Sequence, residues 1–444
     1  MNTFAVNRSK VGERKVTPPH SGGQRVLGFF FALTGALIAT SFLNIGDSGL
    51  PLFYLVVLVP AFAAIFPGIR PATSPIDRRE ISIYLSIGGM FLSLSVVTFF
   101  QIAGDTQSPI GELTHAISRL SFLGYCAACV YYLRGAVLAS CLLWLRRILT
   151  LVALYGVYQV PAKILGFPLV FDWLRNNHSF TLYGYDSAGW ISLVRATSVY
   201  AEPSQCTVPV LVLIFLNIHL RAPRWSKHFV WAVVSAFGLL TFSRTIWVAV
   251  LGLIGLWFLM RYKAVRTRLD RGKLLLAFSL VVVSLLMPVW AFYGGNYKAD
   301  LSRQERAGSV VIGIELIKQH PFIGSGWNSY ETLMPGYPID VENVSPEVTF
   351  KTIHNMFVSY AEQAGIGGFV FALFPFMAIL FWSHAPTGLK YGCMLSFLIV
   401  AELGGDVAYS SLFWLWIAVL LNWTPHSNVD SRASVEPRVL RYAA

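Results

Sequence analysis

The sequence predicts an all-α integral membrane protein with about twelve transmembrane helices. Three observations support this fold class: the composition, the apolar runs and the placement of charge. Of the 444 residues, 55% are hydrophobic and 13% are charged, and the mean hydropathy of +0.59 exceeds that of a water-soluble domain. Apolar runs of about 20 residues, enough to cross roughly 30 Å of hydrocarbon, recur from Val26 nearly to Asn422. Basic residues lie between these runs, where they fix topology.

The apolar runs give the predicted helices in order along the chain. The expected spans are 26–43, 50–66, 81–103, 113–132, 148–166, 201–220, 228–242, 245–260, 274–293, 355–381, 391–404 and 408–422. They form one polytopic domain, 26–422, between a basic tail at 1–25 and a second tail at 423–444. The first run lacks a small-residue cleavage site, so we expect a retained helix and not a signal peptide.

Charge between the spans predicts the orientation of the domain. With the N-terminus in the cytoplasm, short cytoplasmic loops hold most of the 34 Lys and Arg residues, as the positive-inside rule requires. Both tails are then cytoplasmic, and two large loops, about 167–199 and 294–353, face the periplasm. We therefore expect a multi-pass protein of the bacterial inner membrane whose active face is the outer one.

Other function classes fit the sequence poorly. The net charge of +12 comes from basic residues between apolar runs, so we expect no nucleic-acid partner. The five cysteines lie inside or at the ends of apolar segments, which predicts no disulfide framework. No His, Cys and carboxylate spacing resembles a zinc site, so we expect neither a metal nor another cofactor.

Two arginines at the outer boundary are candidate anion-binding residues. Arg244 lies between two apolar runs with almost no polar spacer, where a charge is costly and its planar guanidinium suits bidentate phosphate recognition. The alternative interpretation is an arginine that snorkels to lipid headgroups. Arg195 precedes Glu202-Pro203-Ser204 at the start of the sixth span; Glu202 has a catalytic or Arg-pairing role, or only favours a helix N-terminus.

The second outer loop carries the remaining candidates. Arg303 and Arg306 are one helical turn apart in a predicted helix that runs to Lys318, and they present one cationic face or an ordinary charged surface. The glycines of His320-Pro-Phe-Ile-Gly-Ser-Gly326 indicate a tight turn, because no strand precedes them and the third glycine of a nucleotide loop is missing. His354 begins the tenth span and is suited to proton transfer, although a histidine at this boundary can also serve only as a cap.

Over roughly residues 195–380, the motifs and their order along the chain resemble those of the O-antigen ligase and polysaccharide polymerase superfamily of bacterial inner membranes. The motifs are Ser243-Arg244 opening a span, Asp300-x-Ser302-x-x-x-Arg306, His320-Pro321-Phe-Ile-Gly324-Ser-Gly326, and His354-Asn355 followed by Glu362-x-x-Gly365. The N-terminal half contributes only its number of spans.

The resemblance implies a periplasmic-face glycosyltransferase with an undecaprenyl-diphosphate-linked glycan as donor and a fold similar to that of lipid-carrier-dependent (GT-C-like) glycosyltransferases. The arginines that hold the diphosphate correspond to Arg195, Arg244 and Arg306, and the family histidine to His354. A glycan or lipid A-core is the acceptor, and a chain-length regulator protein is a candidate partner. Catalysis falls to His354 as base or acceptor-orienting group, with Glu202 as the alternative.

Three alternatives remain open at this point. The Glu-Pro-Ser sequence after Arg195 favours a polymerase of O-antigen or exopolysaccharide repeat units over an O-antigen ligase. A transporter or flippase of lipid-linked oligosaccharide fits the span count, but the absence of two related halves argues against it. A structural scaffold would leave Arg244 and His354 without a purpose.

Overall fold

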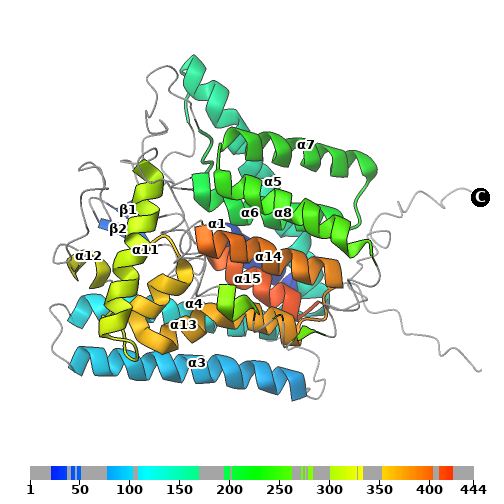
Figure 1. The fold of residues 1–444 in the computed structure, drawn as a ribbon. Coiled ribbons are helices and arrows are strands. Elements are labelled where there is room, and N and C mark those ends of the chain that lie inside the picture. Colours follow the sequence, from blue (N-terminus) through cyan, green and yellow to red (C-terminus); the bar gives the residue numbers. More distant parts are fainter. Residues whose placement is uncertain are drawn as a thin grey trace, which may run out of the picture.

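The structure is a computed structural model, and helices form most of the part of the chain that it describes (Figure 1). It describes residues 22–37, 42–45, 48–51, 78–103, 109–169, 195–200, 203–262, 272–273, 276, 279–283, 301–327, 329–333, 353–403 and 410–423. The helices are α1 Gly22–Leu37, α3 Arg78–Ala103, α4 Pro109–Tyr132, α5 Gly135–Leu165, α6 Thr207–His219, α7 Arg224–Leu240, α8 Arg244–Met260, α11 Leu301–Gln319, α12 Ser329–Leu333, α13 Met356–Trp382, α14 Thr387–Leu403 and α15 Ser411–Leu421, with a 3-10 turn, η3, at Pro203–Cys206.

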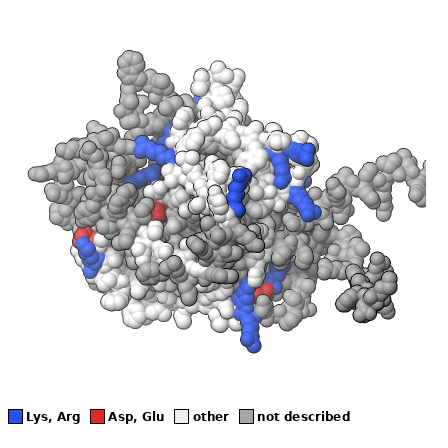
Figure 2. Space-filling view, turned by 45° about the vertical axis from the view of Figure 1, so that its right-hand side comes forward, with Lys and Arg blue, Asp and Glu red and all other residues white. Residues whose placement is uncertain are grey.

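The predicted spans agree with these helices wherever the structure describes them. Ten of the twelve predicted spans overlap a helix, the span 50–66 lies almost entirely outside the described residues, and the described residues of 274–293 are helical. Three helices, α3, α5 and α13, are long and apolar enough to cross a membrane, and Figure 2 shows a surface with few acidic side chains and broad uncharged areas. The described part is thus a helical membrane fold, while the number of crossings stays a prediction.

The helix that contains the predicted fifth span begins earlier than the span itself. The sequence placed a basic cytoplasmic segment before residue 148, but α5 begins at Gly135 and runs through Arg146 and Arg147. The Arg146 Nη2 donates to Asn217 Oδ1 at 3.1 Å and to Ser226 O at 3.1 Å. Arg146 thus bonds residues at the facing ends of α6 and α7, next to the segment at 221–227 that the sequence placed in the cytoplasm.

One short β-hairpin departs from the expected all-α fold. Strands β1 (Phe42–Ile45) and β2 (Ser48–Pro51) pair antiparallel, with Phe42 opposite Pro51 and Ile45 opposite Ser48. A four-residue pair of this kind is marginal by itself, so the helices determine the fold.

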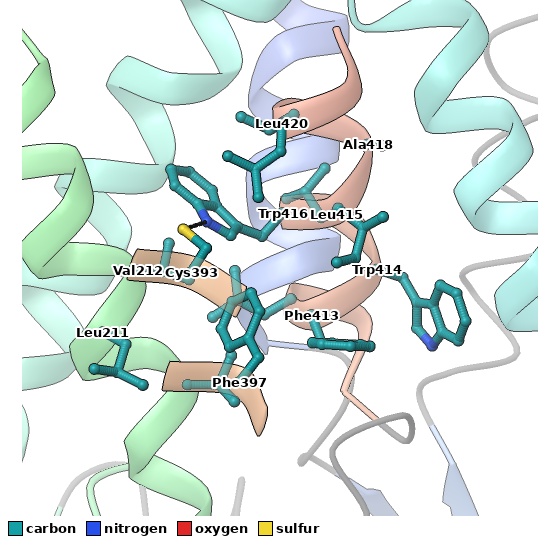
Figure 3. Packing of buried hydrophobic residues seen from close by; sticks show 14 of the residues in the cluster. Leu211, Val212, Cys393, Phe397, Phe413, Trp414, Leu415, Trp416, Ala418 and Leu420 are labelled. Atoms are coloured by element: carbon teal, nitrogen blue, oxygen red, sulfur yellow. Dashed lines mark hydrogen bonds between the residues drawn. The ribbon is translucent and has the colours of Figure 1, made fainter. Parts of the chain in front are cut away.

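The core is built around α15, every residue of which is buried. Figure 3 shows Trp416 pointing toward Cys393 of α14, and its Nε1 donates to the cysteine Sγ at 3.2 Å. Phe413 lies edge-on against Phe397, with 5.2 Å between ring centroids. In lipid, such close packing and interhelical hydrogen bonds hold helices together. All five cysteines are buried and free.

Hydrogen bonds between helix ends show which ends lie together. At one end of the bundle, Asn355 at the start of α13 bonds Glu402 near the end of α14, and Ser411 at the start of α15 donates to the Thr34 carbonyl of α1. At the other end, Ser383 after α13 donates to the Leu420 carbonyl of α15. The first end, called the site end below, collects the helix ends that the sequence predicted to face the periplasm.

Candidate functional site

Helix α11 crosses the site end of the bundle and packs on α13 (Figure 1). The sequence predicted this helix, and its buried face explains its position. The apolar side chains between α11 and the start of α13 are Val310, Ile312, Leu316, Tyr330, Ile353 and Val358. Gly313 permits the close approach, because a Cβ at this position would lie 2.8 Å from Ile353 and Val358.

Arg306 and His354 are joined by a short chain of hydrogen bonds. Arg306 Nη1 donates to the carbonyl of Leu403 at 2.6 Å, which attaches α11 to the end of α14. One turn further on, Ser309 Oγ donates to the Arg306 carbonyl at 2.8 Å and accepts from the His354 N–H at 3.3 Å. Two predicted site residues that are distant in sequence are therefore neighbours in the fold.

Asn355 fixes the backbone beside His354 from two sides. Its Oδ1 accepts from Val358 N at 3.0 Å, which makes it the N-cap of α13. Its Nδ2 donates to Glu402 Oε2 at 2.6 Å. Sequence reasoning missed this use of Glu402, because the partner comes from another helix, 47 residues further along the chain.

Arg195 and Arg244 come together at the turn between α7 and α8. Arg195 Nε donates to Thr241 O at 3.0 Å and its Nη2 donates to Phe242 O at 3.1 Å. Arg244, two residues after Phe242, is the first residue of α8 and is exposed. Arg195 is thus bonded to the backbone of the turn that leads into Arg244, and two of its N–H groups are used to hold that turn.

Helices α8 and α14 bring this turn to the same end of the molecule as Arg306. Gly252 of α8 lies against Ile399 of α14, and Gly392 of α14 lies against Leu253 of α8. The α7–α8 turn belongs to the site end, because the adjoining Tyr200 hydroxyl donates to Ala36 O near the end of α1. The described arginine candidates and His354 thus share one end of the bundle.

Two predicted site residues lie partly or wholly outside the described part of the chain. Arg303 lies in α11 one turn before Arg306, as predicted, but its side chain lies outside the described part. Glu202 lies outside the described residues altogether. Their proposed roles therefore stay predictions.

The predicted tight turn after α11 is present, and it forms hydrogen bonds with the backbone of α13 where that helix is interrupted. Gly365 has φ 58° and ψ −145° in the middle of that helix. The turn supplies substitute partners, because Ser325 N donates to Glu362 O at 2.7 Å and Ile366 N donates to Pro321 O at 3.0 Å. Gln101 Nε2 of α3 donates to Gln363 O at 2.7 Å. Non-helical backbone at membrane depth is tolerated where protein satisfies it in this way.

Two charged residues are buried beside this break. Glu362 is fully buried and its Oε1 accepts from Ser329 Oγ at 2.9 Å. Arg119 of α4 has a relative exposure of 1% and lies over the rings of Tyr360 and Trp327, 5.4 Å and 5.8 Å from their centroids. These cation–π contacts help to keep a guanidinium inside the bundle. Among the described residues no group of His, Cys and carboxylates is suited to hold a metal.

The Asn355–Glu402 pair gives a stability prediction. Asn355→Asp keeps the capping oxygen but faces Glu402 with a second carboxylate, so we expect it to destabilise the protein by roughly 2–3 kcal/mol. Adding Glu402→Gln returns a donor to the pair and is expected to restore most of the loss, as measured by thermal unfolding in detergent. Equal melting temperatures for the single and double variants would show that the two side chains are not coupled.

Comparison with known proteins supports the assignment made from the motifs. Residues 210–373 match a protein-family model described as O-antigen ligase. The matched segment contains Arg244, Arg303, Arg306 and His354, together with the break in α13. Among curated proteins, no significant match was found. The family match confirms, over residues 210–373, that this chain resembles the O-antigen ligase and polymerase superfamily.

Proposed function

We propose that this protein is a glycosyltransferase that works at the periplasmic face of the bacterial inner membrane on a glycan linked to undecaprenyl diphosphate. The family match supports a membrane enzyme of the O-antigen ligase and polymerase group. The observation that carries the proposal is the hydrogen-bonded chain from Arg306 through Ser309 to His354. Because its bonds run through the Arg306 carbonyl and the His354 backbone N–H, it holds these two residues close together at one end of a helical membrane fold.

In this proposal the arginines bind the donor diphosphate. Arg244 and Arg306 are the principal ligands, with Arg195 and Arg303 beside them. As the bond from the anomeric carbon to the diphosphate oxygen breaks, negative charge grows on the leaving group, and prearranged guanidinium groups stabilise that charge. Such a cationic group can perform this task without a metal ion.

His354 is the proposed base. The acceptor hydroxyl oxygen attacks the anomeric carbon, its proton passes to the imidazole, and the diphosphate leaves with the bonding electron pair. The capped start of α13 and the bond from His354 N to Ser309 hold the residue in place. Glu202 is the alternative base.

The acceptor distinguishes the two enzyme classes. A polymerase adds the growing chain to the next lipid-linked repeat unit, whereas a ligase transfers the finished chain to lipid A-core. The Arg195 and Glu202-Pro203-Ser204 pattern favours the polymerase, acting on O-antigen or exopolysaccharide repeats, and the ligase is the alternative. The proposal also includes cytoplasmic termini, a GT-C-like arrangement of helices and a chain-length regulator as partner of a polymerase.

A transporter of lipid-linked oligosaccharide is a second candidate, because the broken helix α13 with buried Glu362 and Arg119 is a feature that transporters share. A deletion strain separates these functions through its surface glycan. Single repeat units on the acceptor indicate a lost polymerase, and bare core with long carrier-linked chains indicates a lost ligase. Carrier-linked glycan confined to the cytoplasmic leaflet would instead indicate a lost transporter and contradict the enzyme proposal.

A further inference from the structure

The α7–α8 turn is held in an unfavourable backbone conformation. Phe242 has φ 49°, in the left-handed region that residues with a Cβ rarely adopt. Such a conformation persists where its surroundings impose it, and it often lies next to a functional group. Here the next residues are Ser243 and Arg244, so the conformation of Phe242 sets where α8 begins.

Arg195 imposes this conformation from outside the turn. Its guanidinium bonds the carbonyls of Thr241 and Phe242 at 3.0 Å and 3.1 Å. The next residue, Ala196, donates its N–H to Leu240 O at 2.9 Å. Three successive carbonyls at the end of α7 are thus bound by two successive residues of one segment.

The segment that carries Arg195 is itself held by one buried side chain. Gln159 of α5 has a relative exposure of 0%, and its Oε1 accepts from the N–H groups of Thr197 and Ser198 at 3.1 Å and 2.7 Å. Its Nε2 donates to Ser198 O at 2.7 Å. Ser198 also has a positive φ of 55°, and its Oγ donates to Val152 O at 2.5 Å.

Close packing keeps Gln159 near the turn. Gly156, one helical turn before it, faces Phe237 of α7, and a Cβ on that glycine would lie 2.1 Å from the phenylalanine ring. A buried amide with three hydrogen bonds on both of its polar atoms has a single favourable orientation. The position of Gln159 on α5 therefore fixes the segment 195–198, and that segment in turn fixes the α7–α8 turn.

We propose that Gln159 and Arg195 are positioning residues that hold the strained turn at Phe242 and so determine where Arg244 presents its guanidinium. The inference rests on the proposed function only in that Arg244 is the group presented. Part of the contribution of Arg195 to the reaction then passes through the turn, in addition to any contact with the diphosphate.

The first test measures the geometry of the turn without using activity. Arg244→Cys is labelled with a membrane-impermeant maleimide, since the native cysteines are buried, and the labelling rate is compared with and without Gln159→Leu. Loss of the buried bonds is expected to change the rate about tenfold. Thr150→Val, a buried change on α5 that removes only a bond to the Arg146 carbonyl, should leave the rate unchanged.

The second test measures transfer of lipid-linked glycan isolated from the deletion strain. Gln159→Leu and Arg195→Lys are expected to lower kcat/KM about tenfold, and Arg195→Lys keeps the charge while losing the two carbonyl bonds. Phe242→Asn, which adopts positive φ more readily, should recover most of the loss in the Gln159→Leu protein. Unchanged labelling together with unchanged kcat/KM in both variants would overturn the inference. Full activity of Arg244→Ala would instead overturn the proposed function, while the labelling result would still stand.

Discussion

Arg244→Ala is expected to lower glycan transfer roughly 10²–10³-fold, because it removes a prearranged cation from the leaving diphosphate. Arg244→Lys should recover only part of this loss, since an ammonium group does not reproduce the planar bidentate contact. The measurement is surface-glycan length in a complemented deletion strain, together with transfer rates in isolated membranes at equal protein levels.

A matched arginine on the same helical pair serves as the control. Arg224 is the first residue of α7 and is exposed, but it lies at the other end of that helix from the turn. Arg224→Ala should retain full transfer. If both variants behave alike, the charge of Arg244 has no special role and the proposed diphosphate site is wrong.

Gly365→Val is expected to prevent accumulation of the folded protein. The φ of 58° and ψ of −145° at this position suit only glycine, and a Cβ would lie 2.3 Å from the carbonyl carbon and oxygen of Phe322. We expect a loss of about 3 kcal/mol or more, measured as membrane protein level and thermal unfolding in detergent.

Gly255 provides the comparison for this result. It lies in α8, and a Cβ there would meet nothing within 4 Å. Gly255→Ala should keep or slightly raise the stability, since alanine favours a helix. A Gly365→Val protein that accumulates and melts like the parent would show that the break in α13 is not a required part of the fold.

The helices were predictable from sequence because their apolar runs are continuous, as in α3, α13 and α15. The start of α5 was not, since the Arg146-Arg147 pair resembles a cytoplasmic loop, and the partners of Arg146, Asn217 and Ser226, belong to other helices. Periodicity reports which residues are apolar, and it does not report which polar residues will find partners on another helix.

In the candidate site, too, residues in local motifs were predictable and residues that act on another segment were not. Arg306 and His354 each belong to a local motif, and the fold joins their backbones through Ser309. Gln159 and Glu402 were missed as supporting residues, because each acts on residues of another segment and has no local pattern. The Glu362-x-x-Gly365 motif contains the break in α13, but only the backbone conformation of Gly365 and its contacts with the turn at 320–327 show that the helix is broken there.

The environment of Arg119 has a consequence for biosynthesis. Ribosomes complete α4 well before they make Trp327 and Tyr360, the aromatic residues that enclose its guanidinium. During that interval these two cation–π contacts of Arg119 cannot form. Fragments that end before α13 lack one of the two rings that contact Arg119, and we expect them to be poor candidates for separate expression.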